Sequence, residues 1–179
     1  MGHTGRSGQR GVTLVELLIG LAILAVLLAL AAPYAGQIIS NAKIRTAAEA
    51  IESGLQLARS SAVNQNAQVQ FALLTGTDSS WTVGCVTPVA GVQSCPAVIQ
   101  SHTAAEGTSQ AIVAADQTAV VFNGFGAANP AANICVGLTG VTTACAASTT
   151  ERRLMVTVGT TGRIRLCDPA LSQPDPQAC

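Results

Sequence analysis

The fold of this chain is decided by residues Gly11 to Tyr34, GVTLVELLIGLAILAVLLALAAPY. From Leu17 to Tyr34 the stretch contains no charged residue, and its single carboxylate belongs to Glu16. A helix from Val12 to Ala32 would be about 31 Å long at about 1.5 Å per residue, which matches the hydrocarbon core of a bilayer. The sequence therefore predicts one long apolar helix near the N-terminus.

A short polar segment, residues 1–11, precedes the apolar run and carries Arg6 and Arg10 but no acidic residue. A secretory signal peptide has the same order, a basic segment followed by an apolar one, but its small-residue cleavage site follows the apolar run. Here the conspicuous small residue, Gly11, comes before that run. The pattern therefore differs from that of an ordinary secretory signal.

The hexapeptide GVTLVE, Gly11 to Glu16, together with the apolar run resembles the class III signal of type IV pilins and pseudopilins, usually written GFTLxE. In that family a prepilin peptidase cuts after the glycine and methylates the new N-terminus. The resemblance implies cleavage between Gly11 and Val12 and methylation of Val12, where the family usually has Phe. It also implies a role in assembly for Glu16, and it matches Pro33 to the proline of the mature helix.

The carboxylate of Glu16 needs a polar partner or environment, because a carboxylate at the bilayer centre costs about 2.5–3.5 kcal/mol, and less near the interface. One hypothesis places Glu16 at headgroup level with no further role. The resemblance implies another, in which the carboxylate pairs with the new amine of Val12 on this or a neighbouring subunit. In filaments of the family, this pairing helps to set the axial register of the subunits.

Length and charge limit the possible functions. The 179 residues leave room for one membrane helix and one modest globular domain. Without residues 1–11 the chain has seven basic and nine acidic side chains, so a strongly basic nucleic-acid binder is excluded and any anion site must be local. Charged residues make up 10% and aromatic residues 3% of the chain, which favours a small, β-rich, extracytoplasmic domain.

The sequence offers no catalytic residue and no cofactor site. It contains no phosphate-loop glycine motif and no metal-ligand spacing. The one histidine outside residues 1–11, His102, lies in a segment rich in Ser, Thr and Ala and is expected to be solvated. Neither an enzyme nor a bound metal or cofactor is therefore predicted.

Six cysteines follow the apolar helix, an even number that favours disulfides in an oxidising compartment. Their clustering favours pairing of neighbours, so that each bridge closes a loop of about ten residues, worth roughly 2.5–3 kcal/mol in the chain-entropy model. A zinc site is the weaker alternative, because the chain has no C-x-x-C pair. The favoured pairs are Cys85–Cys95, Cys135–Cys145 and Cys167–Cys179.

A helical period continues beyond Pro33, where the missing N–H predicts a bend or a local loosening. Apolar residues at steps of three and four predict one stripe, either docked on a sheet or forming a coiled-coil seam. Gly54 and the small number of repeats favour the sheet, and one rod from Val12 to about Asn66 follows. The stripe consists of Ile44, Ala48, Ile51, Leu55, Ala58 and Ala62.

From Gln68 onward the hydrophobic period changes to two. Asn123-Gly124-Phe125-Gly126 marks a sharp turn, because glycine permits positive φ. The fold class is thus α+β, a long N-terminal helix packed on a small antiparallel β-sheet. The predicted strands are Val69–Leu74, Trp81–Val86, Ala97–Ser101, Ala111–Ala114, Ala119–Asn123, Ile134–Gly137, Leu154–Val158 and Arg163–Cys167.

This order of elements, with its FNGFG turn and a late GRIRLCDP strand, is similar to the GspH/FimT branch of minor pilins and pseudopilins. The resemblance implies a leader (1–11), a transmembrane and filament-core helix (12–34), an amphipathic helix (35–66) and a disulfide-stapled β-rich head (67–179). It implies as partners the prepilin peptidase and other pilin or pseudopilin subunits. The implied location is the inner membrane of a Gram-negative bacterium, with the head in the periplasm, and then the filament.

Four of the seven basic residues beyond residue 11 lie in one predicted hairpin near the C-terminus. Alternation of side chains gives this hairpin two distinct faces, with an odd loop such as Gly159–Thr161 keeping the register. The predicted buried face consists of Leu154, Val156, Val158, Ile164 and Leu166. The predicted outer face carries Arg153, Arg163 and Arg165.

Two hypotheses explain the arginines of this hairpin. In the first, they are solvated side chains that protect an edge strand and balance Glu151 and Asp168. In the second, they form a phosphate-binding patch, because guanidinium forks match phosphate oxygens. With one Trp and one Tyr in the chain, sequence-independent contact with a duplex backbone is favoured over base stacking.

The segment Gly162–Arg165, GRIR, also matches the GRxR motif that FimT-like DNA-uptake pilins carry near the C-terminus. By this resemblance Arg163 and Arg165 contact DNA, with Arg152 and Arg153 as helpers. Two functions stay open at this point: a minor pilin of a type IV pilus that binds extracellular double-stranded DNA for natural transformation, or a minor pseudopilin of type II secretion without DNA binding. The arginines favour the first, and their place in a strand does not exclude the second.

Overall fold

The structure is a computed structural model that describes residues 12–89, 95–149 and 151–179. It separates into two compact units, Met1–Ile38 and Ile39–Cys179. The predicted leader and the glycine at its cleavage site, Gly11, lie outside the described residues. Cleavage and methylation therefore stay predictions.

The first unit contains the N-terminal part of α1, a helix of 52 residues from Leu14 to Gln65. Its start is capped by Thr13, whose Oγ1 accepts a hydrogen bond of 3.2 Å from the N–H of Glu16. Glu16 thus lies in the first turn, where a negative charge is favourable beside the helix dipole. The helix continues through Pro33, so the predicted loosening does not interrupt it.

The large apolar side chains from Val12 to Leu30 are between 52% and 75% exposed. Among the residues that the structure describes, no helix is both long enough and apolar enough to cross a membrane. The predicted membrane span stays a prediction.

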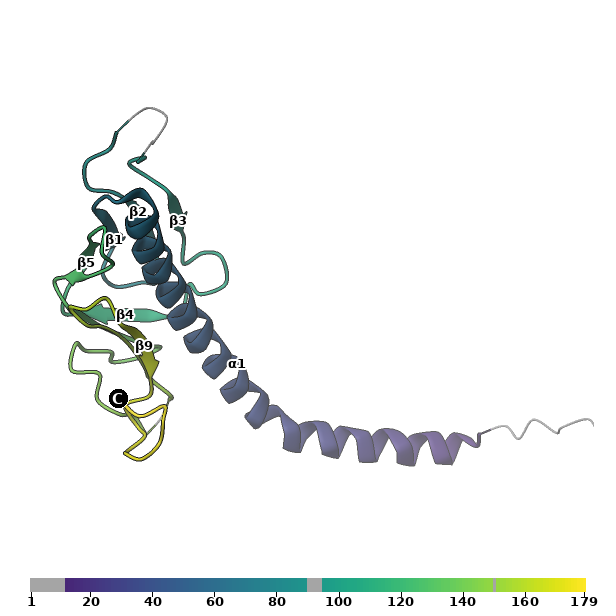
Figure 1. Ribbon diagram of the computed structural model, residues 1–179. Helices are drawn as coiled ribbons and strands as arrows, with labels where there is room; N and C mark the ends of the chain where they lie inside the picture. Colours follow the sequence, from purple (N-terminus) through teal and green to yellow (C-terminus); the bar gives the residue numbers. More distant parts are fainter. Residues whose placement is uncertain (1–11, 90–94, 150) are drawn as a thin grey trace, which may run out of the picture. The chain divides into compact units, whose positions relative to one another are not determined.

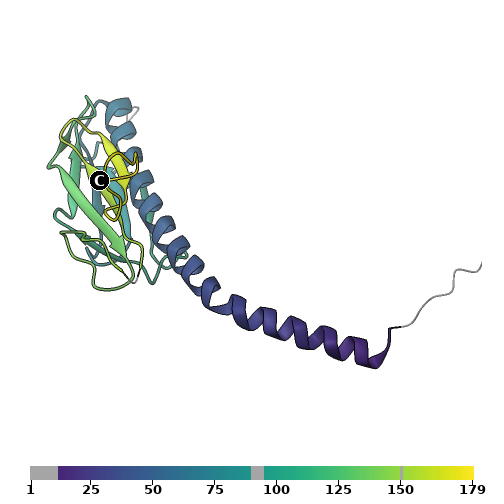
Figure 2. The same cartoon turned by 90° about the horizontal axis from the view of Figure 1, so that it is seen from below.

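In the second unit, the part of α1 beyond Ile39 packs along one face against β-strands. Every residue of the predicted stripe is completely buried, and all six belong to one core together with strand residues such as Phe71, Val83 and Val120. Docking on a sheet, rather than a coiled-coil seam, is therefore confirmed. Figures 1 and 2 show the strands gathered beside this part of α1.

Gly54 allows this packing, because two aromatic rings of the sheet lie where its side chain would be. A Cβ built on Gly54 would lie 2.8 Å from Cε2 of Trp81 and 2.9 Å from Cε2 of Phe71. Both rings are buried, and their centroids are 5.7 Å apart. The glycine that weakens the helix in isolation thus makes room for the aromatic part of the core.

Two antiparallel sheets form the head, where the sequence predicts one small sheet. Within each sheet, every paired strand runs antiparallel to its neighbour. The five-stranded sheet has the order β3 (Gln100–His102), β2 (Trp81–Cys85), β1 (Val69–Leu73), β5 (Ala119–Phe122) and β6 (Ala128–Asn129). The four-stranded sheet has the order β4 (Ile112–Ala115), β7 (Ala132–Gly137), β8 (Leu154–Val158) and β9 (Ile164–Cys167).

The predicted strands agree with the observed ones to within one residue at each end except at three places. The predicted strand Ala97–Ser101 becomes regular only at Gln100, and before it the Ala97 carbonyl lies where a Cβ on Gly84 would be. Strand β6 has two residues and was not predicted, since so short a run carries no alternation. In addition, β7 begins two residues before the predicted strand.

The three disulfides are those favoured by the spacing of the cysteines. Their Cα–Cα distances are 5.7 Å for Cys85–Cys95, 5.3 Å for Cys135–Cys145 and 5.1 Å for Cys167–Cys179. No free cysteine is left, so none is available as a thiolate ligand for zinc. The disulfide prediction is confirmed, and the zinc alternative is excluded.

His102 differs from the prediction. It lies in β3 rather than in a solvated loop, and its side chain is only 19% exposed. Its ring lies 5.8 Å from that of Trp81, the residue opposite it in the β2–β3 pair. Strand pairing therefore carries this histidine into the edge of the aromatic cluster.

Candidate functional site

The predicted C-terminal hairpin is formed by β8 and β9, and β9 is an edge strand of the four-stranded sheet. Leu154, Val156 and Val158 are buried, and Ile164 and Leu166 pack against the core from partly buried positions. The predicted inner face is thus confirmed. Arg165 is paired with Thr157 and lies on the opposite face.

The β8–β9 turn has a three-residue loop, Thr160–Gly162, one position later than the predicted example. The N–H of Gly159 donates to the carbonyl of Arg163 at 2.9 Å, and the N–H of Gly162 donates to the carbonyl of Gly159 at 2.8 Å. Gly162 has a φ of +78°, which glycine adopts without steric cost. The odd number of loop residues keeps the predicted inner and outer faces, but the pairing is shifted by two residues, since Val158 lies opposite Ile164 and not Gly162. The glycine explains where the turn falls.

The β5–β6 turn, Asn123 to Gly126, lies against the β8–β9 turn. The N–H of Ala128 donates to the carbonyl of Thr160 at 3.0 Å, and a Cβ on Gly162 would collide with the carbonyl oxygen of Gly126. Turns from the two sheets therefore meet backbone to backbone. Asn123 holds its turn in shape, since its Oδ1 accepts hydrogen bonds of 3.0 Å from the N–H groups of Phe125 and Ala127.

Arg59 of α1 reaches the same place, and the sequence analysis did not identify it as a site residue. A Cβ built on Gly126 or on Gly162 would lie 3.2 Å from Nε of Arg59. We call the group of Arg59, Gly126, Thr160 and Gly162 the turn junction. Helical spacing places Arg59 off the buried stripe, but no local signal in the sequence connects it to a hairpin a hundred residues away.

Arg163 follows the turn junction directly and is exposed. Within the described ranges, neither Arg163 nor Arg59 has an ion pair or a side-chain hydrogen bond. Both guanidinium groups can therefore bind an external anion without breaking an internal contact.

Arg165 is partly buried and is bound to the C-terminal tail. Its Nη2 donates a hydrogen bond of 3.2 Å to the carbonyl of Ala178. The tail is held beside β9 by the Cys167–Cys179 disulfide. Arg165 thus has one internal partner, and its other N–H groups are left for an external one.

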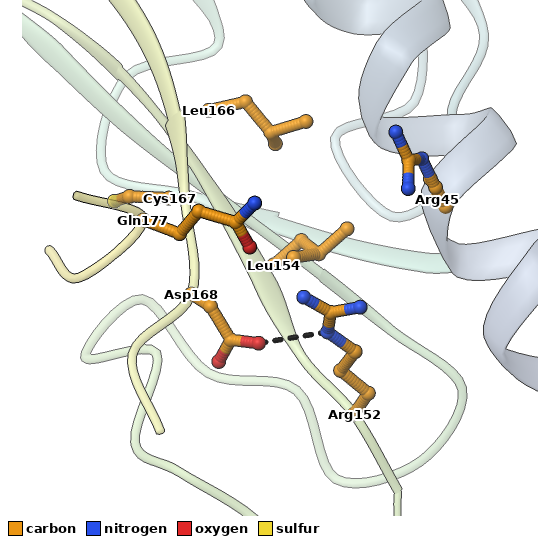
Figure 3. Close-up of a pocket in the computed structure, with 7 residues that line it drawn as sticks. All are labelled: Arg45, Arg152, Leu154, Leu166, Cys167, Asp168 and Gln177. Atoms are coloured by element: carbon orange, nitrogen blue, oxygen red, sulfur yellow. Dashed lines mark hydrogen bonds and ion pairs between the residues drawn. The ribbon is translucent and has the colours of Figure 1, made fainter. Parts of the chain in front are cut away.

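Arg152 lies at the other end of the hairpin and is paired with Asp168. Its Nε is 2.7 Å from Oδ2 of Asp168, whose side chain is 6% exposed (Figure 3). Oδ1 of Asp168 accepts a further hydrogen bond of 2.9 Å from the N–H of Ala170. The carboxylate therefore fixes both the arginine and the start of the tail.

The side chain of Arg153 is only 12% exposed. The prediction that it shares an open outer face with Arg163 and Arg165 is therefore wrong. It donates hydrogen bonds of 3.0 Å to the carbonyls of Ala146 and Thr139. Its Nε is 3.6 Å from Glu151, which in turn accepts a hydrogen bond from Thr139. The loop between β7 and β8 thus covers Arg153, a tertiary contact that strand alternation cannot predict.

Figure 3 shows a small pocket beside the Arg152–Asp168 pair, lined also by Arg45 and Gln177. Its volume of ≈ 120 Å³ is well below the roughly 300–1,000 Å³ of small-molecule sites. Arg45 donates from Nε to Glu49 at 2.6 Å, and this hydrogen bond together with the charge of Glu49 raises the pKa of Arg45 above its ordinary value. The pocket is therefore a poor candidate for a cofactor or substrate site, and its arginines already have acidic partners.

Comparisons with known proteins agree with this fold. The profile of the family described as type II transport protein GspH matches residues 47–162, and that of the prokaryotic N-terminal methylation motif matches residues 6–32. No curated protein sequence gives a significant match.

Among solved structures, the chain is similar to the type IV minor pilin FimU of Pseudomonas aeruginosa strain PAO1. In one crystal form of FimU, the identity is 23% and the TM-score 0.51, with 75% of this chain and 98% of FimU covered. In another crystal form, the identity is 22% and the TM-score 0.51, with 76% of this chain and 94% of FimU covered. It is also similar to the minor pseudopilin EpsH of the Vibrio cholerae type 2 secretion system, with 12% identity, a TM-score of 0.53, and 72% of this chain and 99% of EpsH covered. The predicted fold and resemblance are confirmed.

Proposed function

The chain belongs to the GspH family of type II transport proteins, whose profile spans well over half of it, and from this premise we propose that it is a minor pilin of a type IV pilus that binds DNA. Pilin and pseudopilin subunits are structural components, and we accordingly propose a structural rather than an enzymatic role for this chain. The proposal has two parts, assembly through the N-terminal helix and contact with DNA through the C-terminal hairpin.

The first part rests on the apolar run of α1. A prepilin peptidase cuts between Gly11 and Val12, and the run that follows anchors the chain in the inner membrane before assembly. Large apolar side chains from Val12 to Leu30 are more than half exposed, and such a surface is stable only when lipid or neighbouring subunits cover it. Other pilin subunits are accordingly the partners of this helix in the filament.

Glu16 is the residue that directs assembly in this proposal. Its N–H is bonded to Thr13, while its side chain is exposed and free to meet the amine of Val12 on a neighbouring subunit. We expect Glu16→Ala to leave the protein in the membrane fraction but to exclude it from filaments. Glu16→Asp, which keeps the charge, should assemble in part, and normal incorporation of Glu16→Ala would show that the carboxylate has no such role.

The second part rests on one observation, the exposed guanidinium of Arg163 without an internal partner. Arg165 lies on the same face of the hairpin and has N–H groups to spare. Contacts of this kind bind the phosphate backbone without reading the sequence. Arg152 and Arg153 are engaged with Asp168 and with the β7–β8 loop, so the proposal gives them supporting roles.

The test is a titration of the mature chain in detergent with labelled duplex DNA at several salt concentrations. If Arg163 and Arg165 each neutralise one phosphate, log K should fall with log salt with a slope of about −1.8. The double variant Arg163→Gln/Arg165→Gln should lose most of this slope and bind several-fold more weakly. Arg45→Gln removes a charge that is already paired and serves as the control; equal affinity of the double variant and wild type rejects DNA binding here.

The alternative function is that of a minor pseudopilin of type II secretion. The matching family favours it, since that family is named for type II transport. A deletion strain separates the two: loss of natural transformation with normal secretion supports the pilus, and the reverse supports the secretion system.

A further inference from the structure

Two cations that are more than a hundred residues apart in sequence flank the turns at the turn junction. Arg59 comes from α1 and Arg163 from the start of β9, and both lack an acidic partner among the residues described. Arg45, Arg152 and Arg153 each have a carboxylate within 3.6 Å. Arg59 and Arg163 therefore lie at one end of the hairpin and the arginines with acidic partners at the other, while Arg165 between them donates only to the carbonyl of Ala178.

The two unpaired arginines approach the turn from different sides. Gly162 and Ile164 lie on the side of α1, where Arg59 and Ile164 line the same groove, whereas Arg163 lies on the outer face by strand alternation. Gly126 and Gly162 are themselves buried, whereas the arginines that flank them are exposed. A strand of nucleic acid that meets the tip of the hairpin can therefore contact both guanidinium groups.

Phe125 projects from the neighbouring turn and is 93% exposed, the highest value among the large apolar residues described. Its backbone is fixed, because its N–H donates to Asn123 Oδ1 at 3.0 Å and the next residue, Gly126, has a φ of +78°. Single apolar side chains are common on protein surfaces, but a ring this exposed on a fixed turn is fully accessible to a ligand that reaches the turn. The ring thus marks the same place as the two arginines.

The groove of α1 beside this place is lined by the apolar side chains of Val63 and Ile164 and by four polar ones. Gln56, Ser60 and Asn64 line it together with Arg59, and they offer amide and hydroxyl donors. Donors of these types commonly contact phosphate and sugar in protein–DNA interfaces. The surroundings of Arg59 therefore suit a nucleic-acid backbone.

We propose that Arg59, Phe125 and Arg163 form one contact site for duplex DNA at the turn junction. The arginines bind phosphates, and the phenyl ring lies against the sugars and base edges of the minor groove, as apolar side chains of groove-binding proteins do. This inference rests on the proposed DNA binding and extends it, since it adds a helix residue and an aromatic residue to the arginines of β9. It places the main contacts at the tip of the hairpin, while Arg152 and Arg153 at the other end keep only their supporting roles.

The experiment measures the affinity of the full mature chain in detergent for a labelled DNA duplex between about 50 and 200 mM salt. Arg59→Gln should weaken binding several-fold and reduce the salt slope by about 0.9, the share of one phosphate. Arg59→Lys should keep the slope. Phe125→Ala should weaken binding and leave the slope unchanged, because the ring carries no charge.

Arg45→Gln is the matched control, since Arg45 is exposed on the same helix but is bonded to Glu49. It should bind like wild type, and thermal unfolding of each variant verifies that the head is intact. Wild-type affinity in either Arg59→Gln or Phe125→Ala overturns the three-residue site. If those two bind normally while Arg163→Gln binds weakly, the inference fails and the proposed function stands; if wild type does not bind DNA, the proposed function itself fails.

Discussion

The carbonyl oxygen of Gly126 occupies the position that a side chain on Gly162 would need. This contact joins the turns of the two sheets, and it places Arg163 and Arg59 at one end of the head. A larger residue at position 162 would have to separate the turns. The geometry of the proposed DNA site therefore depends on a residue without a side chain.

Gly162→Ala should lower the stability of the head by more than the cost of backbone strain alone. A left-handed backbone costs an L-residue about 1–2 kcal/mol, and the collision with Gly126 adds to this. Since about 1 kcal/mol corresponds to roughly 2–4 °C in a chain of this size, the melting temperature should fall by more than about 4 °C. Gly140→Ala is the control: Gly140 also has a positive φ, of +54°, but a Cβ there meets only the Arg153 side chain at 3.6 Å.

Gly54→Leu should disrupt the packing of α1 on the head. The new side chain would displace the buried rings of Trp81 and Phe71, and overpacking of this kind costs typically 1–3 kcal/mol or more. Trp81 is the only tryptophan, so its fluorescence follows the transition directly. Ser53→Leu, at the adjacent exposed position, should change stability by less than about 0.5 kcal/mol; equal effects of the two substitutions would contradict the close approach at Gly54.

Arg153→Gln should mainly lower the stability of the head, whereas Arg163→Gln should mainly weaken DNA binding. The first removes hydrogen bonds to Ala146 and Thr139 and leaves Glu151 without its cation, so we expect a loss of about 1–3 kcal/mol. The second removes an exposed cation without internal contacts and should leave the melting temperature unchanged. In DNA titrations, Arg163→Gln should lose more affinity than Arg153→Gln. A large loss of stability in Arg163→Gln would indicate that Arg163 makes a structural contact.

Removal of the Cys167–Cys179 disulfide should release the C-terminal tail. The closed loop is short, and its loss should cost roughly 2.5–3 kcal/mol in the chain-entropy model. Hydrogen exchange should speed up at Ala170 and Ala178, whose N–H groups are bonded within the tail. The double variant Cys85→Ser/Cys95→Ser should not change exchange at these two amides, which separates a local effect from global unfolding.

Asp78 should contribute a small part of the loss of folding stability at low pH. Burial raises the pKa of Asp78, but hydrogen bonds from the Ser80 backbone and from the Ser80 and Thr75 side chains together lower it below its ordinary value. A lowered folded-state pKa gives stability that is present above the unfolded value, near 3.9, and is lost as the pH falls through the folded value. Asp78→Asn should therefore show a smaller drop in melting temperature below about pH 4 than wild type.

The sequence predicts the helix and most strands because their signals are periodic and local. Ile51 and Leu55 repeat at helical spacing, and Leu154 to Val158 alternate, so the buried faces follow from the pattern. The disulfides are predicted because their partners are neighbours in the chain. The division into two sheets cannot be predicted from the pattern, because the alternation around Val113 or Val120 does not specify which strands will pair.

The candidate site is predicted less well, because it depends on contacts between residues far apart in the sequence. Arg163 and Arg165 are marked by a local motif, whereas Arg59 reaches the hairpin only through the packing of α1 on the sheets. Arg153 has the spacing of an outer-face residue, but the β7–β8 loop folds over it. Which cations are free is thus decided by tertiary contacts, and these cannot be deduced from spacing along a strand.

Each disulfide joins cysteines that are only 10 or 12 residues apart, and none ties α1 to the head or one sheet to the other. In the export that we propose, each pair can therefore be oxidised as soon as its own short segment has emerged, without waiting for the rest of the chain. Mispairing between segments is disfavoured because the correct partner is the nearest cysteine. On this proposal, a thiol oxidase alone, without an isomerase, should be sufficient to form the three disulfides.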